Sequence, residues 1–182
     1  MTAEIKSAYL ASEGLSEPLL KEVDGVISVH DRLILSSQPF VNAYWAQNIW
    51  KNPVTLSVDS ISDAAKKLKS IQRNWCLYSF ALHRRAQLIQ EKLNSSKPQP
   101  MLFSTPLLSQ GTGSWCLLDK NTLLASADCS SPFPNGAPSF IEDKNGPPNR
   151  AYLKLYESLT LAGKIPVEGE FCIDIGGSPG GW

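Results

Sequence analysis

The hydrophobic positions between residues 54 and 127 change their period several times. Val54–Val58 and Trp75–Phe80 are short runs rich in apolar residues, which are typical of strands. Each run is followed by apolar residues at helical spacing, which are Ile61, Ala65, Leu68 and Ile71, then Leu82, Ala86, Ile89 and Leu93. Ser60 or Ser62 is expected to cap the first of these helices. Ser114–Ala127 predicts a hairpin that turns at Asp119-Lys120-Asn121. This order of elements predicts a small α+β layer domain.

In residues 1–56 the hydrophobic patterns are shorter and predict short strands and helices. A short apolar run spans Ala8–Ala11, and Glu17–Val23 predicts a helix with Pro18 in its first turn. Gly25–Ser36 alternates like two strands around His30-Asp31-Arg32. After Pro39, helical spacing predicts a further helix with its aromatic residues in the core, and the residues at that spacing are Phe40, Tyr44, Trp45 and Ile49.

Composition narrows the class of protein. No apolar run approaches the roughly 18 to 20 residues of a membrane span, and the start, MTAEIKSAYL, lacks the features of a signal peptide. We therefore expect a cytoplasmic protein with no membrane partner. The four cysteines form no CxxC pair, which argues against zinc and for reduced thiols. Seventeen basic and seventeen acidic residues balance, which counts mildly against nucleic-acid binding, although a local basic face is compatible with this balance.

The composition changes at Ser130. Residues 130–150 hold five of the thirteen prolines and predict a linker or a loop laid on a surface. Leu153, Tyr156 and Leu159 then predict a helix from about Arg150 to Ala162, with Gly163 near its end. The apolar run FCIDI, residues 171–175, predicts a buried parallel strand that enters the glycine turn GGSPGG.

This glycine turn is compatible with more than one ligand class, because glycine permits close approach of the backbone. A phosphate loop requires GxxxxGK[ST], and the turn has no lysine. A dinucleotide fingerprint requires GxGxxG, and Ser178 occupies a required glycine position, which disfavours a nucleotide-dependent oxidoreductase. The S-adenosylmethionine loop of doubly wound methyltransferases remains, with Asp174 just before the turn. A tight turn without a ligand is the alternative.

Two separate motifs together point to a family. Arg150-Ala151-Tyr152-Leu153-Lys154-Leu155 and the later DIGGSPGGW resemble the FtsJ-like RNA ribose 2′-O-methyltransferases, whose pattern is close to S-R-A-x-x-K-L, a helix, and a strand ending D-L-G-x-x-P-G-G-W. Asn149 and Ile175 stand where that family often has Ser and Leu. SSPFPNGAPSF before PPNRAYLKL, and more weakly QPFVNAYWAQNIW, are similar to the M-type large-subunit ribosomal RNA methyltransferases.

The resemblance implies a fold and a domain organisation. The fold is expected to be an α+β N-terminal region, ferredoxin-like and THUMP-like, followed by the first helix and strand of a truncated α/β Rossmann-like methyltransferase domain. The expected segments are an N-terminal α+β segment (1–56), a THUMP-like RNA-binding domain (57–130), a Pro-rich linker (131–149) and the start of the methyltransferase domain (150–182). Three of the family's four Lys-Asp-Lys-Glu residues would lie beyond Trp182, so this chain alone is expected to be inactive.

The resemblance also implies site residues. Lys154 matches the first lysine of the tetrad and would be catalytic, although an exposed helix lysine is the simpler interpretation of that residue by itself. S-adenosyl-L-methionine would be the cofactor, and its binding residues would be Asp174, Gly176, Gly177, Ser178, Pro179, Gly180, Gly181 and Trp182. The expected partner is RNA, by family analogy large-subunit ribosomal RNA, with no metal.

A basic stretch in the two middle helices is the expected RNA contact. Residues 66–92 contain one acid, Glu91, and seven basic residues, which are Lys66, Lys67, Lys69, Arg73, Arg84, Arg85 and Lys92. Both helices can pack on one side of the sheet, so Lys66, Lys67, Arg84 and Arg85 are predicted to bind RNA phosphates. The alternatives are an ordinary solvated surface and, for the whole protein, a non-catalytic RNA-binding module.

Overall fold

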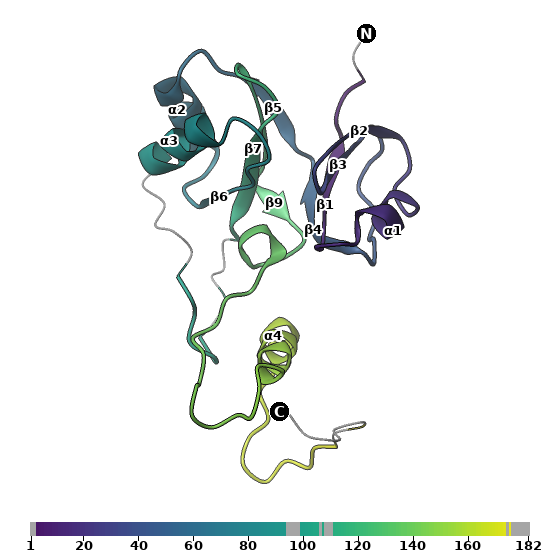
Figure 1. Ribbon diagram of the computed structural model, residues 1–182, viewed down its shortest axis with the longest axis vertical. Helices are drawn as coiled ribbons and strands as arrows, with labels where there is room; N and C mark the ends of the chain where they lie inside the picture. Colours follow the sequence, from purple (N-terminus) through teal and green to yellow (C-terminus); the bar gives the residue numbers. More distant parts are fainter. Residues whose placement is uncertain (1–2, 94–98, 106, 108–110, 174, 176–182) are drawn as a thin grey trace. The chain divides into compact units, whose positions relative to one another are not determined.

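The computed structural model describes residues 3–93, 99–105, 107, 111–173 and 175. The chain divides into two compact units, which we name unit 1 (residues 1–97 and 109–137) and unit 2 (residues 98–108 and 138–182). The described residues form four α-helices and two open sheets (Figure 1). The mixed α+β class predicted from the sequence is therefore confirmed.

Both sheets belong to unit 1. Its strands are β1 (Ser7–Ala11), β2 (Val26–His30), β3 (Leu33–Ser36), β4 (Ala46–Lys51), β5 (Val54–Ser57), β6 (Trp75–Leu77), β7 (Gly113–Leu117), β8 (Thr122–Ser126) and β9 (Asp128–Cys129). Its helices are α1 (Ser16–Leu20), α2 (Ile61–Ile71), α3 (His83–Leu93) and the short 3-10 helix η1 (Pro134–Gly136). The two strands around His30-Asp31-Arg32, both middle helices and the hairpin at Asp119-Lys120-Asn121 are confirmed.

The strand order fixes the direction of the helices. The first sheet has the order β2-β3-β1-β4-β9 with antiparallel neighbours. The second sheet has the order β5-β8-β7-β6, in which the β6–β7 pair is parallel and the other pairs are antiparallel. Strands β5, β6 and β7 therefore point the same way. Helices α2 and α3 connect these strands, so both return in the opposite direction and run side by side in the same sense.

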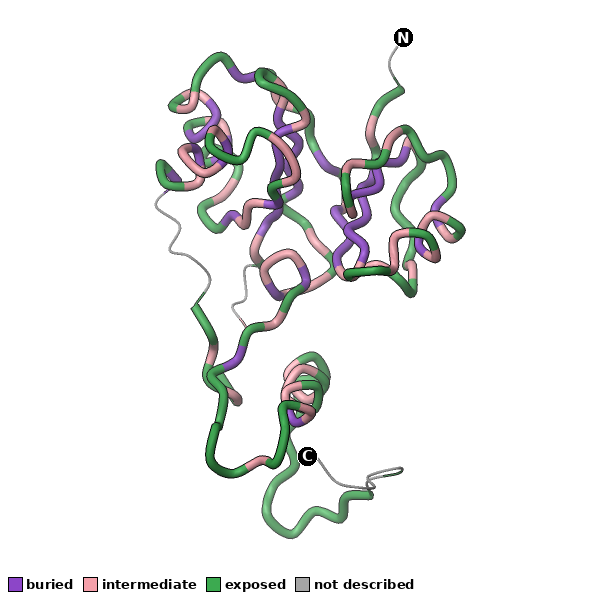
Figure 2. Tube along the Cα trace, viewed as in Figure 1, coloured by how far each residue is buried: buried purple, intermediate pink, exposed green. Residues whose placement is uncertain are grey.

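Unit 1 is built in layers. Helices α2 and α3 pack on one face of the second sheet, around Trp75 and Trp115. The other face of this sheet packs against the first sheet, where Leu10, Leu35 and Trp50 contact the layer that contains Cys116 and Leu124. The opposite face of the first sheet is covered by α1 through Leu19 and neighbouring residues. Figure 2 shows the buried positions concentrated in the strands between these layers.

The shared core explains why the compact units have other boundaries than the expected segments. Residues from 1–56 and from 57–130 occupy one hydrophobic cluster, and β9 pairs with β4 across that division. The first part of the expected Pro-rich linker also belongs to unit 1. The side chain of Asn135 donates a 3.0 Å hydrogen bond to the carbonyl oxygen of Leu77 and accepts one of 2.9 Å from Ser114 Oγ.

The helix predicted after Pro39 is wrong. Residues 46–51 form strand β4, and the preceding residues 39–45 are not helical. Pairing with β1 overrides the helical spacing, because Ile49 and Trp50 point to opposite faces of the sheet and both become buried. The expected core position of the earlier aromatic residues is also wrong, because Phe40 is 37%, Tyr44 95% and Trp45 43% exposed.

Unit 2 contains helix α4 (Tyr152–Ala162), which confirms the predicted helix before Gly163. Gly163 ends the helix in the left-handed region at φ 64°. Tyr156 stacks on Phe103 with ring centroids 3.9 Å apart and contacts Tyr152 and Phe140 edge to face. Residues 98–108 therefore join unit 2 although they lie between two elements of unit 1.

The strand predicted over FCIDI is not formed in the described part of that segment. Residues 171–173 have no regular structure, and Phe171 and Ile173 are 89% and 71% exposed. A single apolar run needs a neighbouring strand for its backbone groups, and none pairs with it among the described residues.

In the part of the chain that the structure describes, the helices are too short or too polar to cross a bilayer.

Candidate nucleic-acid interface

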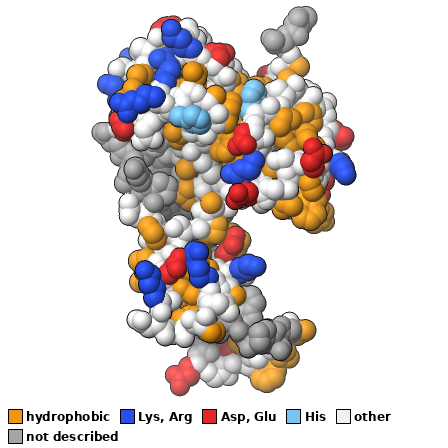
Figure 3. Space-filling model, viewed as in Figure 1, with side chains coloured by type: hydrophobic (Ala, Val, Ile, Leu, Met, Phe, Trp, Pro, Cys, Tyr) orange, Lys and Arg blue, Asp and Glu red, His pale blue; other side chains and the backbone are white. Residues whose placement is uncertain are grey.

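Helices α2 and α3 form one exposed surface above the second sheet. Their apolar faces lie in one core cluster, with Ala64, Ala65 and Leu68 from α2 and Ala86 and Ile89 from α3. Ser60 caps α2 by accepting a 3.1 Å hydrogen bond from the backbone N–H of Asp63. The alternation of apolar and polar residues thus leaves four basic side chains of the two helices exposed, which are Lys66, Lys69, Arg84 and Lys92. Figure 3 shows Lys and Arg side chains gathered over these two helices.

A groove between the two helices brings cations from both of them together. Its lining residues are Ser62, Ala65, Lys66, Lys69 and Lys92. We name it the α2/α3 groove. A second depression continues beyond Lys69 and is lined by Lys69, Arg73, Asn74 and Leu93. Both linings lack a carboxylate, so phosphate oxygens would meet four cationic side chains without an acidic neighbour in the lining.

Lys67 differs from these cations because its ammonium group is already paired with other residues of the chain. Its Nζ lies 2.8 Å from Asp63 Oδ2 and donates a 2.7 Å hydrogen bond to the carbonyl oxygen of Ser57. The Lys67 ammonium holds the pKa of Asp63 below its usual value. By contrast, Lys66, Lys69 and Lys92 make no ion pair with any of the described residues.

The four predicted RNA-binding residues therefore have different environments in the structure. Lys66 lines the α2/α3 groove, Lys67 is paired with Asp63, and Arg84 is exposed on α3. Arg85 is half-buried, and its Nε and Nη2 atoms are buried without a hydrogen-bond acceptor among the described residues. Lys69 and Lys92 were counted in the basic stretch but not chosen as contacts. Spacing could have found Lys69, because Lys66 and Lys69 are three positions apart on one helical face, but it could not have found Lys92 on the other helix.

Lys154 lies on α4 in unit 2, at an exposed position. It lines a pocket with Pro138, Ser139, Phe140, Glu142, Arg150, Leu153 and Glu157. Arg150 Nη2 and Glu142 Oε1 are 2.7 Å apart in this pocket. The helix thus places Lys154 beside a paired arginine and two carboxylates. This setting is compatible with a catalytic lysine and with a solvated one.

The expected cofactor-binding residues are outside the described part of the chain. They are Asp174, Gly176, Gly177, Ser178, Pro179, Gly180, Gly181 and Trp182. The adjacent described residues 171–173 are exposed and irregular.

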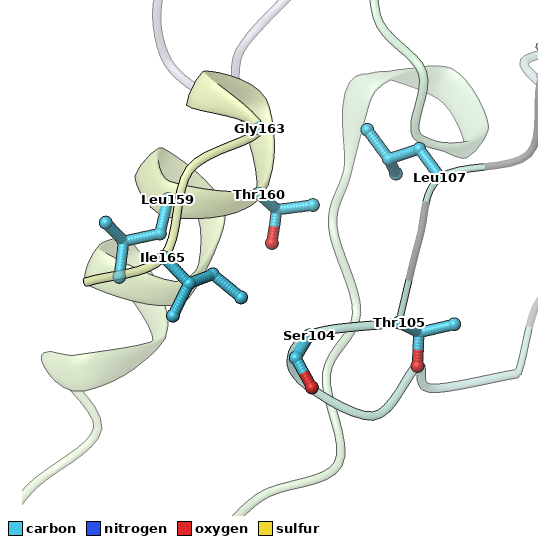
Figure 4. A pocket seen from close by; sticks show the side chains of 7 residues that line it. All are labelled: Ser104, Thr105, Leu107, Leu159, Thr160, Gly163 and Ile165. Carbon is cyan, nitrogen blue, oxygen red and sulfur yellow. The ribbon is translucent and has the colours of Figure 1, made fainter. Parts of the chain in front are cut away.

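Another pocket in unit 2 is mostly apolar. It has a volume of about 350 Å³ and is lined by Ser104, Thr105, Leu107, Leu159, Thr160, Gly163 and Ile165. Figure 4 shows the side chains of Thr160 and Ile165 on one side of the opening and that of Leu107 on the other. Its lining contains no acid, base or cation, so these residues supply no group for proton transfer.

Each of the two histidines lies beside a serine hydroxyl. The His30 ring lies 4.9 Å from the Phe80 ring and 3.0 Å from Ser28 Oγ, and burial lowers the pKa of His30. His83 Nδ1 is 2.7 Å from Ser79 Oγ. Within the described ranges, no three His, Cys, Asp or Glu side chains gather as candidate metal ligands.

No family model, no curated protein and no solved structure matches this chain. The similarity to RNA ribose methyltransferases therefore depends on the motifs quoted from the sequence. The functional argument depends on those motifs and on the geometry of the two helices.

Proposed function

We propose that unit 1 binds RNA phosphates along the α2/α3 groove, as the RNA-binding part of a cytoplasmic enzyme that methylates RNA ribose 2′-hydroxyls. The observation that carries the proposal is the lining of the groove, where Lys66, Lys69 and Lys92 converge from two helices and no carboxylate is among the lining residues. Unpaired cations in one groove favour a polyanion, and their contacts with phosphates are independent of base sequence.

The catalytic half of the proposal is supported by the Arg150–Leu155 and DIGGSPGGW motifs. In such an enzyme, S-adenosyl-L-methionine supplies the methyl group, and the glycine turn from Asp174 to Trp182 would hold this cofactor. Lys154 would help to position the ribose hydroxyl, and the N-terminal THUMP-like region would capture the RNA. By family analogy the substrate is large-subunit ribosomal RNA.

The binding half is tested by titrating a structured RNA against the chain at several salt concentrations. Replacing Lys66, Lys69 and Lys92 together by Ala removes up to three phosphate contacts. The slope of log K against log salt should then flatten by roughly 2 to 2.7. The matched control is Lys67→Ala, which removes a lysine that is already paired with Asp63. An unchanged slope in the triple variant, or an equal change in the control, would reject this groove as the RNA site.

The catalytic half needs a separate test in the protein that includes the rest of the expected catalytic domain. Lys154→Ala should leave cofactor affinity nearly unchanged and reduce single-turnover methyl transfer by about 10²-fold or more. Methyl transfer within a few-fold of the wild-type rate would mean that Lys154 is a solvated surface lysine without a catalytic role.

A non-catalytic RNA-binding module is the second candidate. It is favoured by one observation: the lining residues of the α2/α3 groove all belong to unit 1. Calorimetry with S-adenosylmethionine separates the two candidates. The enzyme requires cofactor binding by the complete protein, and the module requires none.

A further inference from the structure

The guanidinium group of Arg85 is placed at an energetic disadvantage in the free protein. Its Nε and Nη2 atoms are buried and have no hydrogen-bond acceptor among the described residues. The side chain makes no ion pair within the same residues. Buried donors that lose water without gaining an acceptor destabilise the folded state, and the effect is larger when the group is charged.

Arg85 shares a face of α3 with a residue that lines the α2/α3 groove. Arg85 and Lys92 are seven positions apart, which is close to two helical turns, so they share a face of α3. Lys92 lines the α2/α3 groove beside Lys69. Ser62 is seven positions before Lys69 on α2 and lines the same groove. Arg85 is not among the lining residues of the groove, but since both helices run in the same sense, its position along α3 corresponds to the Ser62 end.

We propose that Arg85 is the anchoring contact for one phosphodiester group in the α2/α3 groove, and that its guanidinium turns from its unpaired position onto that phosphate when RNA binds. The proposal rests on the RNA-binding function proposed above. A guanidinium presents paired donors that match two phosphate oxygens, which an ammonium group does not. Lys66, Lys69 and Lys92 then follow the adjacent phosphates, so a chain of phosphates fits the groove better than a single ion.

This arrangement predicts that a substitution of Arg85 changes RNA affinity and the stability of the free protein in opposite directions. A variant that removes the unpaired donors should stabilise the free protein and weaken RNA binding. Arg85→Met is suitable because it keeps an unbranched apolar stem. We expect it to raise the melting temperature by about 2–4 °C and to weaken RNA binding by about tenfold or more. The salt slope should fall by roughly 0.7 to 0.9.

Two further variants complete the test. Arg84→Met removes the exposed neighbouring charge and should leave the melting temperature unchanged, with a smaller loss of affinity. Arg85→Lys keeps the charge without the paired donors and should not restore wild-type affinity. Equal losses in Arg84→Met and Arg85→Met, or full affinity in Arg85→Lys, would overturn the anchoring role. A lower melting temperature in Arg85→Met would show that the guanidinium stabilises the free fold, which also overturns the proposal.

Inorganic phosphate is the probe that distinguishes the two sources of a phosphate group. We expect RNA to raise the melting temperature of the chain and inorganic phosphate to have no comparable effect. Equal protection by inorganic phosphate would replace RNA with a free anion as the ligand. If the triple lysine variant keeps full RNA affinity, the proposed function fails. If that variant loses affinity while Arg85→Met does not, this inference alone fails.

Discussion

The side-chain nitrogen of Gln47 donates a 2.8 Å hydrogen bond to the backbone carbonyl oxygen of Asn135, 88 residues later in the sequence. Gln47 lies on β4 of the first sheet, while the Asn135 side chain bonds to Leu77 and Ser114 of the second sheet. One short turn therefore ties both sheets together. The sequence Pro-Asn-Gly at this turn suits it, because Asn135 and Gly136 both have positive φ angles.

Substitution of Gly136 should be costly for two separate reasons. At φ +74° an added Cβ is strained, and it would also lie 2.1 Å from the carbonyl oxygen of Gln47. Gly14 is a matched control, with φ +75° and nothing within 4 Å of an added Cβ. In urea unfolding, Gly14→Ala should cost about 1–2 kcal/mol, and Gly136→Ala about 2 kcal/mol more than that. Equal losses would mean that the contact with Gln47 relaxes without cost.

Removal of the Asn135 side chain should destabilise unit 1. Asn135→Ala leaves the Leu77 carbonyl and the Ser114 hydroxyl without this partner, which should lower the free energy of unfolding by about 1–3 kcal/mol. Asn135→Gly relieves the positive φ and so separates backbone strain from the lost hydrogen bonds. The exposed Asn145 provides a control, since Asn145→Ala should change stability by less than about 0.5 kcal/mol. A loss in Asn135→Ala that Asn135→Gly fully restores would assign the effect to the backbone alone.

The two fully buried tryptophans should respond differently to the same substitution. Trp50 and Trp115 are both 0% exposed. Trp115 Nε1 donates a 2.8 Å hydrogen bond to Gln90 Oε1, whereas Trp50 Nε1 is buried without an acceptor among the described residues. Trp115→Phe should therefore cost about 1 kcal/mol more than Trp50→Phe. Chemical denaturation measures both, and the reverse order would contradict the assignment of the unpaired donor.

Stability should fall in alkaline solution partly through Tyr78. Burial, and then its 2.6 Å hydrogen bond to Asp31, raise the pKa of Tyr78 to about 12. Between about pH 10 and 12 the unfolded chain loses this proton while the folded chain keeps it, so the free energy of unfolding decreases as pH rises. Tyr78→Phe should make this decrease shallower. Tyr44→Phe, at a residue that is 95% exposed, should leave the pH dependence unchanged, and equal slopes in both variants would exclude Tyr78 as a source.

The sequence predicted the elements whose periodicity and packing agree. Ala65, Leu68, Ala86 and Ile89 were expected on helical faces, and all four are buried under α2 and α3. The region after Pro39 failed because long-range pairing of β4 with β1 outweighs local spacing, and no local pattern reports such pairing. For the same reason, the common core of residues 1–56 and 57–130 was not foreseen.

The candidate groove was predictable only in part. The sequence indicated basic residues on two helices that share one side of a sheet. It did not indicate that Lys67 is paired with Asp63 or that two nitrogens of Arg85 are buried, because both depend on how the side chains pack. The sequence did not indicate Lys92 as a contact, because its approach to Lys69 depends on the relative direction of α2 and α3, which follows from the strand order.

Because residues 98–108 belong to unit 2, unit 1 is not one continuous segment of the chain, and this affects how it can be produced alone. The backbone passes from one unit to the other near residues 97, 108 and 137, so one cut after residue 137 does not yield unit 1 free of the other unit. The shortened chain would keep Phe103 while losing Tyr156, the ring on which Phe103 stacks. Isolation of unit 1 therefore requires a short polar bridge in place of residues 98–108 as well as the cut. Without that bridge, the shortened chain could lose solubility because Phe103 becomes exposed, even if unit 1 itself folds stably.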